Sequence, residues 1–216
     1  MQITPVRPER LVEEVTELIL TRSGRVRIAV DGAPPTRPGP LADAVARQLR
    51  SRGRSVLVVA AMDYLRPASV RLEFGRRDPD AFLDSWLDVG AVVREVLDPS
   101  GPDGSGRVLP RLWNVATDRS YRDDYVDLAL DGVLVLTGSL LLGRGLPLDL
   151  AVHLRMTANA LARLLDEQEH WTLPAYGRYE TENDPASNSD LLVLADHPNR
   201  PAVTRGPWKR GGRGGS

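Results

Sequence analysis

The chain has 216 residues, 42% of them hydrophobic, a length that suits one medium-sized α/β domain with a substantial core. Its 28 basic and 29 acidic side chains give a net charge of −1, so the whole molecule has no electrostatic drive toward nucleic acid or an acidic membrane. It has no cysteine, which excludes disulfides, thiolate metal sites and a cysteine nucleophile. No apolar run approaches the roughly 18 residues that span a bilayer, and we expect a soluble cytoplasmic protein.

The first part of the chain predicts a helix followed by a β-α-β crossover. Apolar residues at helical spacing within 8–22 predict an amphipathic leading helix. A short β-branched run at 25–31 predicts a strand, and residues 40–50 predict the helix after it. Residues 55–61 are almost wholly apolar, as in a strand of a parallel sheet that is covered on both faces.

The remainder of the chain predicts three more buried strands and a small insertion. The elements are, in order, short helices within 68–98, a β-ribbon of 107–114 with 125–128, strands at 132–137, 148–154 and 190–196, and a helix at about 157–169. The expected fold class is α/β, with three layers, α/β/α, around a mostly parallel five-stranded sheet and a small helical and β-ribbon insertion. We expect a single domain over 1–204, with the leading helix in 1–23 and the core in 25–200, and a disordered Arg/Gly tail over 205–216.

The segment after the first core strand has the frame of a phosphate-binding loop but lacks the residues that hold a phosphate. A loop of the form G-x-x-x-x-G-K-[ST] cradles phosphate oxygens with backbone N–H groups, a lysine and a hydroxyl that binds Mg²⁺. Counting from Gly32, Arg37 replaces the second glycine. Pro38 replaces the lysine and Gly39 the hydroxyl residue, and the only lysine in the chain is Lys209. Four prolines also remove amide donors, so the sequence predicts a degenerate loop, whose positions of interest are Gly32, Ala33, Thr36, Arg37 and Gly39.

Several separated segments together resemble the uridine kinase-like branch of the P-loop nucleoside kinases. Residues 28–32 match the strand that enters the phosphate loop, and Met-Asp-Tyr-Leu-Arg-Pro at 62–67 resembles the family's Asp-Asp-Phe-Tyr-Arg-Pro segment. The resemblance covers roughly 24–200 and implies a P-loop NTPase-like fold, with ATP and Mg²⁺ as cofactors only if kinase activity is retained. The other matching segments, in the family's order, are 78–82, 97–99, 104–106, 132–142, 171–179 and 195–196.

The resemblance places Asp63 where the family needs a base for the acceptor hydroxyl. It implies that Asp63 accepts the sugar hydroxyl proton in a kinase, or hydrogen-bonds a sugar in a protein without catalysis. The alternative is a helix-capping aspartate before residues 65–74. We expect Tyr64, Arg66 and Trp86 to line the same cleft, at the carboxyl ends of the strands, with a core position as the alternative for Trp86.

Four further polar residues are expected to lie in the cleft or in the core. Thr137 replaces the family's acid at the end of its strand, and Arg178 is what remains of the lid arginines. Asp31 is expected either to cap the turn that follows it or to face the cleft. His153, in an apolar strand, is expected to be a buried and hydrogen-bonded histidine. No histidines have metal-ligand spacing, so we predict no metal site.

These features support three functional hypotheses. The leading one is a catalytically silent pseudoenzyme that binds a nucleoside or nucleotide and acts as a binding or regulatory module. The first alternative is an active uridine- or cytidine-type nucleoside kinase, or a small-molecule kinase, that places phosphates with Arg37, Arg155 and Arg178. The second is a scaffold that binds a partner through the leading helix or the tail. The tail at 205–216 has the composition of either a single-stranded RNA-binding segment or a solvated disordered end. The oligomeric state is not predicted.

Overall fold

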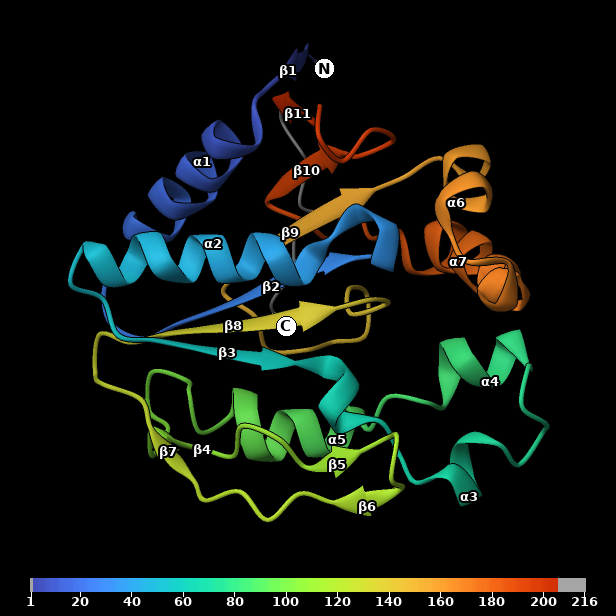
Figure 1. Ribbon diagram of the computed structural model, residues 1–216. Coiled ribbons are helices and arrows are strands. Elements are labelled where there is room, and N and C mark those ends of the chain that lie inside the picture. Colours follow the sequence, from blue (N-terminus) through green and yellow to red (C-terminus); the bar gives the residue numbers. More distant parts are fainter. Residues whose placement is uncertain (1, 206–216) are drawn as a thin grey trace, which may run out of the picture.

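The computed structural model describes residues 2–205, which are built around a seven-stranded sheet (Figure 1). The strand order is β1-β11-β10-β9-β2-β8-β3. Neighbouring strands from β10 to β3 are parallel, whereas β11 runs antiparallel to both β10 and β1. The sheet strands are β1 (Gln2–Pro5), β2 (Val26–Gly32), β3 (Val56–Ala60), β8 (Val133–Gly138), β9 (Leu150–Arg155), β10 (Leu191–Leu194) and β11 (Ala202–Arg205).

Helices cover both faces of this sheet. The α-helices are α1 (Pro8–Leu20), α2 (Pro38–Ser51), α3 (Ala68–Arg71), α4 (Pro79–Asp84), α5 (Val89–Val92), α6 (Ala158–Leu164) and α7 (Leu173–Arg178). Short 3₁₀ segments are η1 (Pro34–Thr36), η2 (Ala61–Tyr64) and η4 (Glu167–Thr172), and short π segments are η3 (Val93–Leu97) and η5 (Tyr179–Asn183). Within residues 2–205, none of the helices combines the length and the apolar character needed to cross a bilayer.

Successive residues of the central strands belong to two different hydrophobic cores. In β8, Val133 and Val135 pack with α1 and α2, whereas Leu134 and Leu136 pack with the helices of the other face. Side chains of a strand alternate between the faces of a sheet, so a strand buried on both faces has a continuous apolar sequence. The α/β class, the three layers and the five predicted core strands are therefore confirmed. The sheet has seven strands instead of five because β1 and β11 extend one edge.

The insertion between β3 and β8 differs in detail from the single ribbon predicted. It contains two separate pairs, β4 (Arg107–Val108) with β7 (Val126–Asp127) and β5 (Trp113–Asn114) with β6 (Arg119–Ser120). The second pair forms locally because Asn114 Oδ1 accepts the amides of Ala116 and Thr117, and Asp118 takes a left-handed conformation with φ of 51°. Part of the predicted ribbon therefore closes as a short hairpin of its own (Figure 1).

Candidate functional site

The loop between β2 and α2 is closed around one of its own side chains. Thr36 is 6% exposed, and its hydroxyl donates to the carbonyl of Ala33 at 2.7 Å. The amide of Thr36 donates to the same carbonyl at 2.8 Å, and the amide of Arg37 donates to the carbonyl of Pro34 at 3.0 Å. These N–H groups are satisfied within the loop, so they are not directed at an anion in the way that a phosphate cradle requires.

The rest of the loop is fixed by close packing. A Cβ on Gly32 would meet Thr36 Oγ1 and would come within 2.9 Å of Leu154 Cβ. Arg37 is left-handed, with φ of 62°, and α2 begins at the residue after it. The Arg37 side chain is exposed, and its Nη1 donates to Asn199 Oδ1 at 3.4 Å. Gly39 lies in the first turn of α2, where a Cβ would contact nothing within 4 Å.

A cavity of about 740 Å³, called the cleft below, lies beside this loop at the carboxyl ends of the strands. Of the residues singled out in the sequence, Arg37, Gly39, Trp86 and Thr137 line it. The indole of Trp86 packs edge-on against Phe82, with ring centroids 5.1 Å apart. Among the described residues, Trp86 Nε1 and Thr137 Oγ1 are buried polar atoms with no hydrogen-bond partner.

Tyr64 lies in the core and not in the cleft wall, which corrects the expectation for this residue. Its side chain is fully buried, and its hydroxyl donates to the carbonyl of Leu109 in the insertion at 2.5 Å. Burial and the nearby Glu95 raise the pKa of this phenol. Arg66 is half-buried and also lies outside the cleft lining. Its backbone amide donates to the carbonyl of Trp86 at 2.8 Å, where the insertion folds back on itself.

Asp63 is half-buried and faces the insertion. Burial raises the pKa of its carboxyl, an effect that Tyr121 and Arg111 partly offset. It does not cap α3, because Asp118 Oδ1 accepts the first amide of that helix, from Ala68, at 2.8 Å. Asp63 is not among the residues that line the cleft, so its role as a base or sugar ligand stays a prediction.

Two of the three arginines that the kinase hypothesis assigns to phosphates, Arg155 and Arg178, form ion pairs outside the cleft. Arg178 pairs with Asp80 at 2.5 Å and with Glu182 at 2.9 Å, and thereby joins α7 to α4 on the surface. Arg155 pairs with Glu180 at 3.1 Å. Neither Arg178 nor Arg155 lines the cleft.

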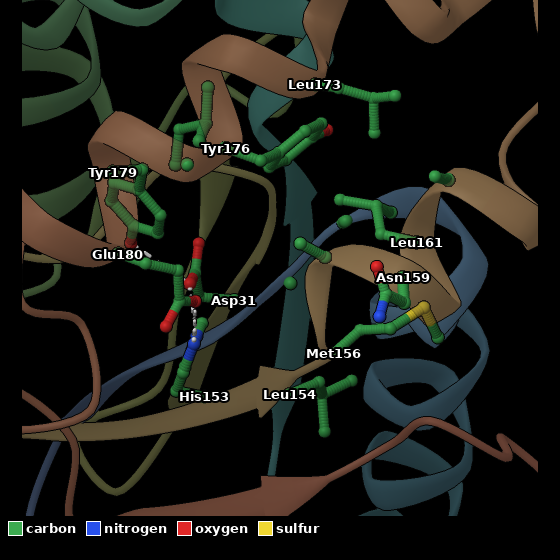
Figure 2. Close-up of a pocket in the computed structure, with 16 residues that line it drawn as sticks. Asp31, His153, Leu154, Met156, Asn159, Leu161, Leu173, Tyr176, Tyr179 and Glu180 are labelled. Atoms are coloured by element: carbon green, nitrogen blue, oxygen red, sulfur yellow. Dashed lines mark hydrogen bonds and ion pairs between the residues drawn. The ribbon is translucent and has the colours of Figure 1, made fainter.

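A second, smaller cavity of about 330 Å³, called the inner cavity below, contains a buried charged network (Figure 2). Asp31 is fully buried there and faces this cavity, and does not cap the turn that follows it. Its Oδ2 lies 2.7 Å from His153 Nδ1 and accepts the Tyr179 hydroxyl at 3.0 Å. Its Oδ1 accepts the amide of Leu141 at 2.9 Å, and His153 Nε2 lies 3.2 Å from Glu180 Oε1.

This network carries a positively charged imidazole at neutral pH. Burial lowers the pKa of His153, but the hydrogen bonds to Asp31 and Glu180 outweigh it and raise the pKa to about 9. For Glu180, burial is likewise outweighed, by His153 and Arg155, which hold the pKa of the carboxyl below its usual value. The expectation of a buried, satisfied His153 therefore agrees with the structure. Within the described part of the chain, no group of three or more His, Asp or Glu side chains could hold a metal ion.

Tyr179, Glu180 and Arg144 are polar residues of these two cavities that were not singled out in the sequence. Tyr179 and Glu180 follow α7 and complete the network around Asp31. Arg144 lines the cleft, where its Nε donates to the carbonyl of Leu140 at 2.5 Å and its Nη2 to the carbonyl of Leu83. Burial lowers the pKa of Arg144. Of these three residues, only Tyr179 could have been found from the sequence, because it is the last residue of the 171–179 segment that resembles the kinase family.

The architecture matches solved structures over most of their length. A protein described as a possible uridine kinase from Bacillus stearothermophilus aligns with a TM-score of 0.68 over 84% of this chain and 96% of its own, at 18% identity. The chain has the uridine kinase-like P-loop kinase fold. A protein assigned as a fructose transport system kinase from Silicibacter sp. TM1040 aligns with a TM-score of 0.57 over 90% of this chain and 96% of its own, at 20% identity. The YGR205w protein aligns with a TM-score of 0.55 over 91% and 97%, at 11% identity. No model of a protein family and no curated protein sequence matches the chain.

The segment from Gly32 to Gly39 runs from the end of β2 into the first turn of α2, which is where the resemblance implies a phosphate-binding loop. The Asp63 segment follows the next strand, β3, as the resemblance implies. At these low identities the structural likeness establishes the architecture of the chain. The chemistry has to be argued from its own residues.

Proposed function

We propose that this uridine kinase-like protein binds a nucleoside or nucleotide in its cleft without transferring phosphate, and that it acts as a binding or regulatory module. The observation that carries the proposal is the position of Thr36. Its side chain lies inside the loop and bonds to the Ala33 carbonyl, in the place where a phosphate-binding loop leaves room for phosphate oxygens.

The residues present do not fit ATP with Mg²⁺. Phosphoryl transfer depends on positioning and on electrostatic stabilisation of charge spread over the transferred group. The lysine is replaced by Pro38, the metal-binding hydroxyl by Gly39, and the acid at the end of β8 by Thr137. Removing one stabilising contact of this kind typically costs about 3 kcal/mol of transition-state stabilisation, so losing several together removes ordinary turnover.

The competing hypothesis of an active kinase needs free arginines near the loop. Arg178 and Arg155 are paired with carboxylates. Arg37 is exposed and reaches Asn199. A guanidinium can grip a phosphate by two parallel hydrogen bonds, but Arg178 already uses three of its nitrogens on acidic partners. These contacts favour the catalytically silent hypothesis over the kinase.

The test is calorimetry with ATP·Mg²⁺ and then with uridine, together with a coupled ADP-release assay on uridine and cytidine. We expect heat from uridine, no magnesium-dependent heat from ATP, and no ADP release. Turnover that is lost in Asp63→Ala and kept in Asp43→Ala, a change at an exposed aspartate on α2, would establish the kinase instead. Absence of heat from both compounds would favour the scaffold hypothesis. The proposed RNA-binding tail lies at 205–216, beyond the described residues except for Arg205.

A further inference from the structure

The loop contributes an apolar surface to the cleft in the place where it would hold a phosphate. Pro34, Pro35, Pro38 and Pro40 all line the cleft. A proline has no N–H to donate, so these four residues offer carbon surface to a ligand and no anion contact. The aromatic side chains of Phe82, Trp86 and Tyr176 line the same cavity. Such a wall suits a flat apolar body far better than a phosphate chain.

The charged residues of the cleft do not compensate for this surface. Arg37 and Arg144 line it, but so do Asp166 and Glu169, and the four charges balance. Two nitrogens of Arg144 already donate to backbone carbonyls, and Arg37 reaches outward to Asn199. The cleft lining therefore carries no net positive charge, and the Arg144 fork is already engaged with backbone carbonyls, so neither feature favours a phosphorylated ligand.

Two hydrogen-bond donors lie directly behind the cleft wall without a partner among the described residues. They are Trp86 Nε1 and Thr137 Oγ1, both buried, on residues that line the cavity. A threonine hydroxyl has three staggered positions about χ1, so the Thr137 hydroxyl can turn toward a ligand by rotation. A buried donor without a partner destabilises the protein, so a ligand that offers an acceptor at this point gains affinity.

We infer that the cleft takes an uncharged molecule with a flat aromatic body and a hydrogen-bond acceptor, and that it discriminates against the phosphorylated form of such a molecule. The inference rests on the proposed function and narrows its ligand class. The cavity of about 740 Å³ lies within the usual range of small-molecule sites and accommodates a two-ring body.

The test compares three naphthalenes that share one ring system. 2-Methoxynaphthalene carries an ether acceptor, 2-ethylnaphthalene has nearly the same shape without one, and 2-naphthyl phosphate carries the anion. We expect 2-methoxynaphthalene to bind about 3–10-fold more tightly than the ethyl compound by calorimetry, and Thr137→Val to abolish that difference. We expect 2-naphthyl phosphate to bind at least about 10-fold more weakly than 2-methoxynaphthalene. Equal or tighter binding of the phosphate, or no binding of either uncharged compound, would overturn the inference.

A matched pair of surface variants locates the site. Met62 is 64% exposed and lines the cleft, whereas Phe74 is 70% exposed and does not. Met62→Glu and Phe74→Glu therefore make the same kind of change at little cost in folding. We expect only Met62→Glu to weaken the uncharged probes, by about 5-fold or more, and an equal effect of both variants would contradict the assignment. ADP release is measured in the same samples and tests only the proposed absence of phosphoryl transfer. If the protein released ADP but still preferred 2-methoxynaphthalene, the proposed function would be wrong and the inferred ligand class would stand.

Discussion

His153 Nδ1 lies 2.7 Å from Asp31 Oδ2, so a buried ion pair joins the neighbouring strands β9 and β2 beside the inner cavity (Figure 2). On its other side the same imidazole reaches Glu180, in the segment after α7, at 3.2 Å. Figure 2 shows these charged groups at one end of the cavity and Met156, Leu161 and Leu173 at the other. The network therefore ties the last helical segment to the centre of the sheet.

We expect the free energy of unfolding to fall as the pH rises from about 6.5 to about 9. The pKa of His153 is raised from 6.5 to about 9 in the folded protein, so the folded state binds this proton more tightly than the unfolded chain. The contribution of protonated His153 to the free energy of unfolding is complete below pH 6.5 and is lost as the pH rises through 9. An interval of about 2.5 pH units corresponds to on the order of 3 kcal/mol. Urea unfolding at several pH values measures it.

The control for this prediction is His197→Gln, a change at an exposed histidine outside the network. We expect His153→Gln to remove most of the pH dependence and to lower stability, because it leaves buried carboxylates without their cation. Should that variant fail to fold, an NMR titration of the wild-type imidazole gives the answer directly. An apparent pKa of 6.5 or below for His153 would contradict the prediction.

Closure of the loop around Thr36 predicts that Gly32→Ala is destabilising by about 1–3 kcal/mol, the usual cost of overpacking a tight site. The new methyl group would collide with Thr36 Oγ1 and with Leu154. The double variant Gly32→Ala/Thr36→Ala should recover part of the loss and not all of it, because the contact with Leu154 remains. Urea unfolding of the four proteins in a double-mutant cycle measures the coupling.

Gly39→Ala is the matched control for that cycle. It adds the same methyl group in the same loop-to-helix segment, where nothing lies within 4 Å. We expect it to leave stability unchanged or to raise it by less than about 1 kcal/mol, since alanine favours the helix. If Gly32→Ala and Gly39→Ala behaved alike, the loop would not be packed around Thr36.

The ion pairs of Arg178 and Arg27 have similar distances, but the two arginine side chains differ in exposure, and we expect them to contribute differently to stability. Arg178 lies on the surface, and we expect Arg178→Ala to melt at the wild-type temperature within error, because exposed pairs contribute little. Arg27 is 13% exposed and donates two N–H groups to Asp149, at 3.0 and 2.9 Å. We expect Arg27→Ala to cost about 2 kcal/mol. A larger loss for Arg178→Ala would show that its link between α7 and α4 holds the fold.

The core strands could be predicted from sequence because each is a continuous apolar run that is buried on both faces. The strands β1 and β11, which extend one edge of the sheet, could not be predicted. Each has four residues, and they pair with each other across almost the whole chain, so no local pattern marks them. The absence of a lysine and a hydroxyl residue at positions 38 and 39 follows directly from the residue identities, whereas the loss of phosphate binding by this loop stays a prediction.

The charged network was beyond the reach of sequence patterns. His153 meets Asp31 across 122 residues and Glu180 across 27, and only the register of β2 against β9 brings the first pair together. For Tyr64, the sequence predicted a position that the structure does not show. Its neighbours in sequence predicted a place in the cleft, but the Leu109 carbonyl of the insertion offers a buried partner for its hydroxyl. Long-range hydrogen bonds decided both positions.

Two buried hydroxyl groups should respond in opposite ways to removal. In Tyr64→Phe the Leu109 carbonyl loses its donor, and we expect a loss of about 1–2 kcal/mol. In Thr137→Val the hydroxyl removed has no partner among the described residues, so we expect unchanged or slightly increased stability. Calorimetric melting resolves the difference, because each kcal/mol shifts the Tm of a protein of this size by about 2–4 °C. An equal drop in Tm for both variants would mean that Thr137 is hydrogen-bonded within the fold, and its hydroxyl would then not be available to a ligand in the cleft.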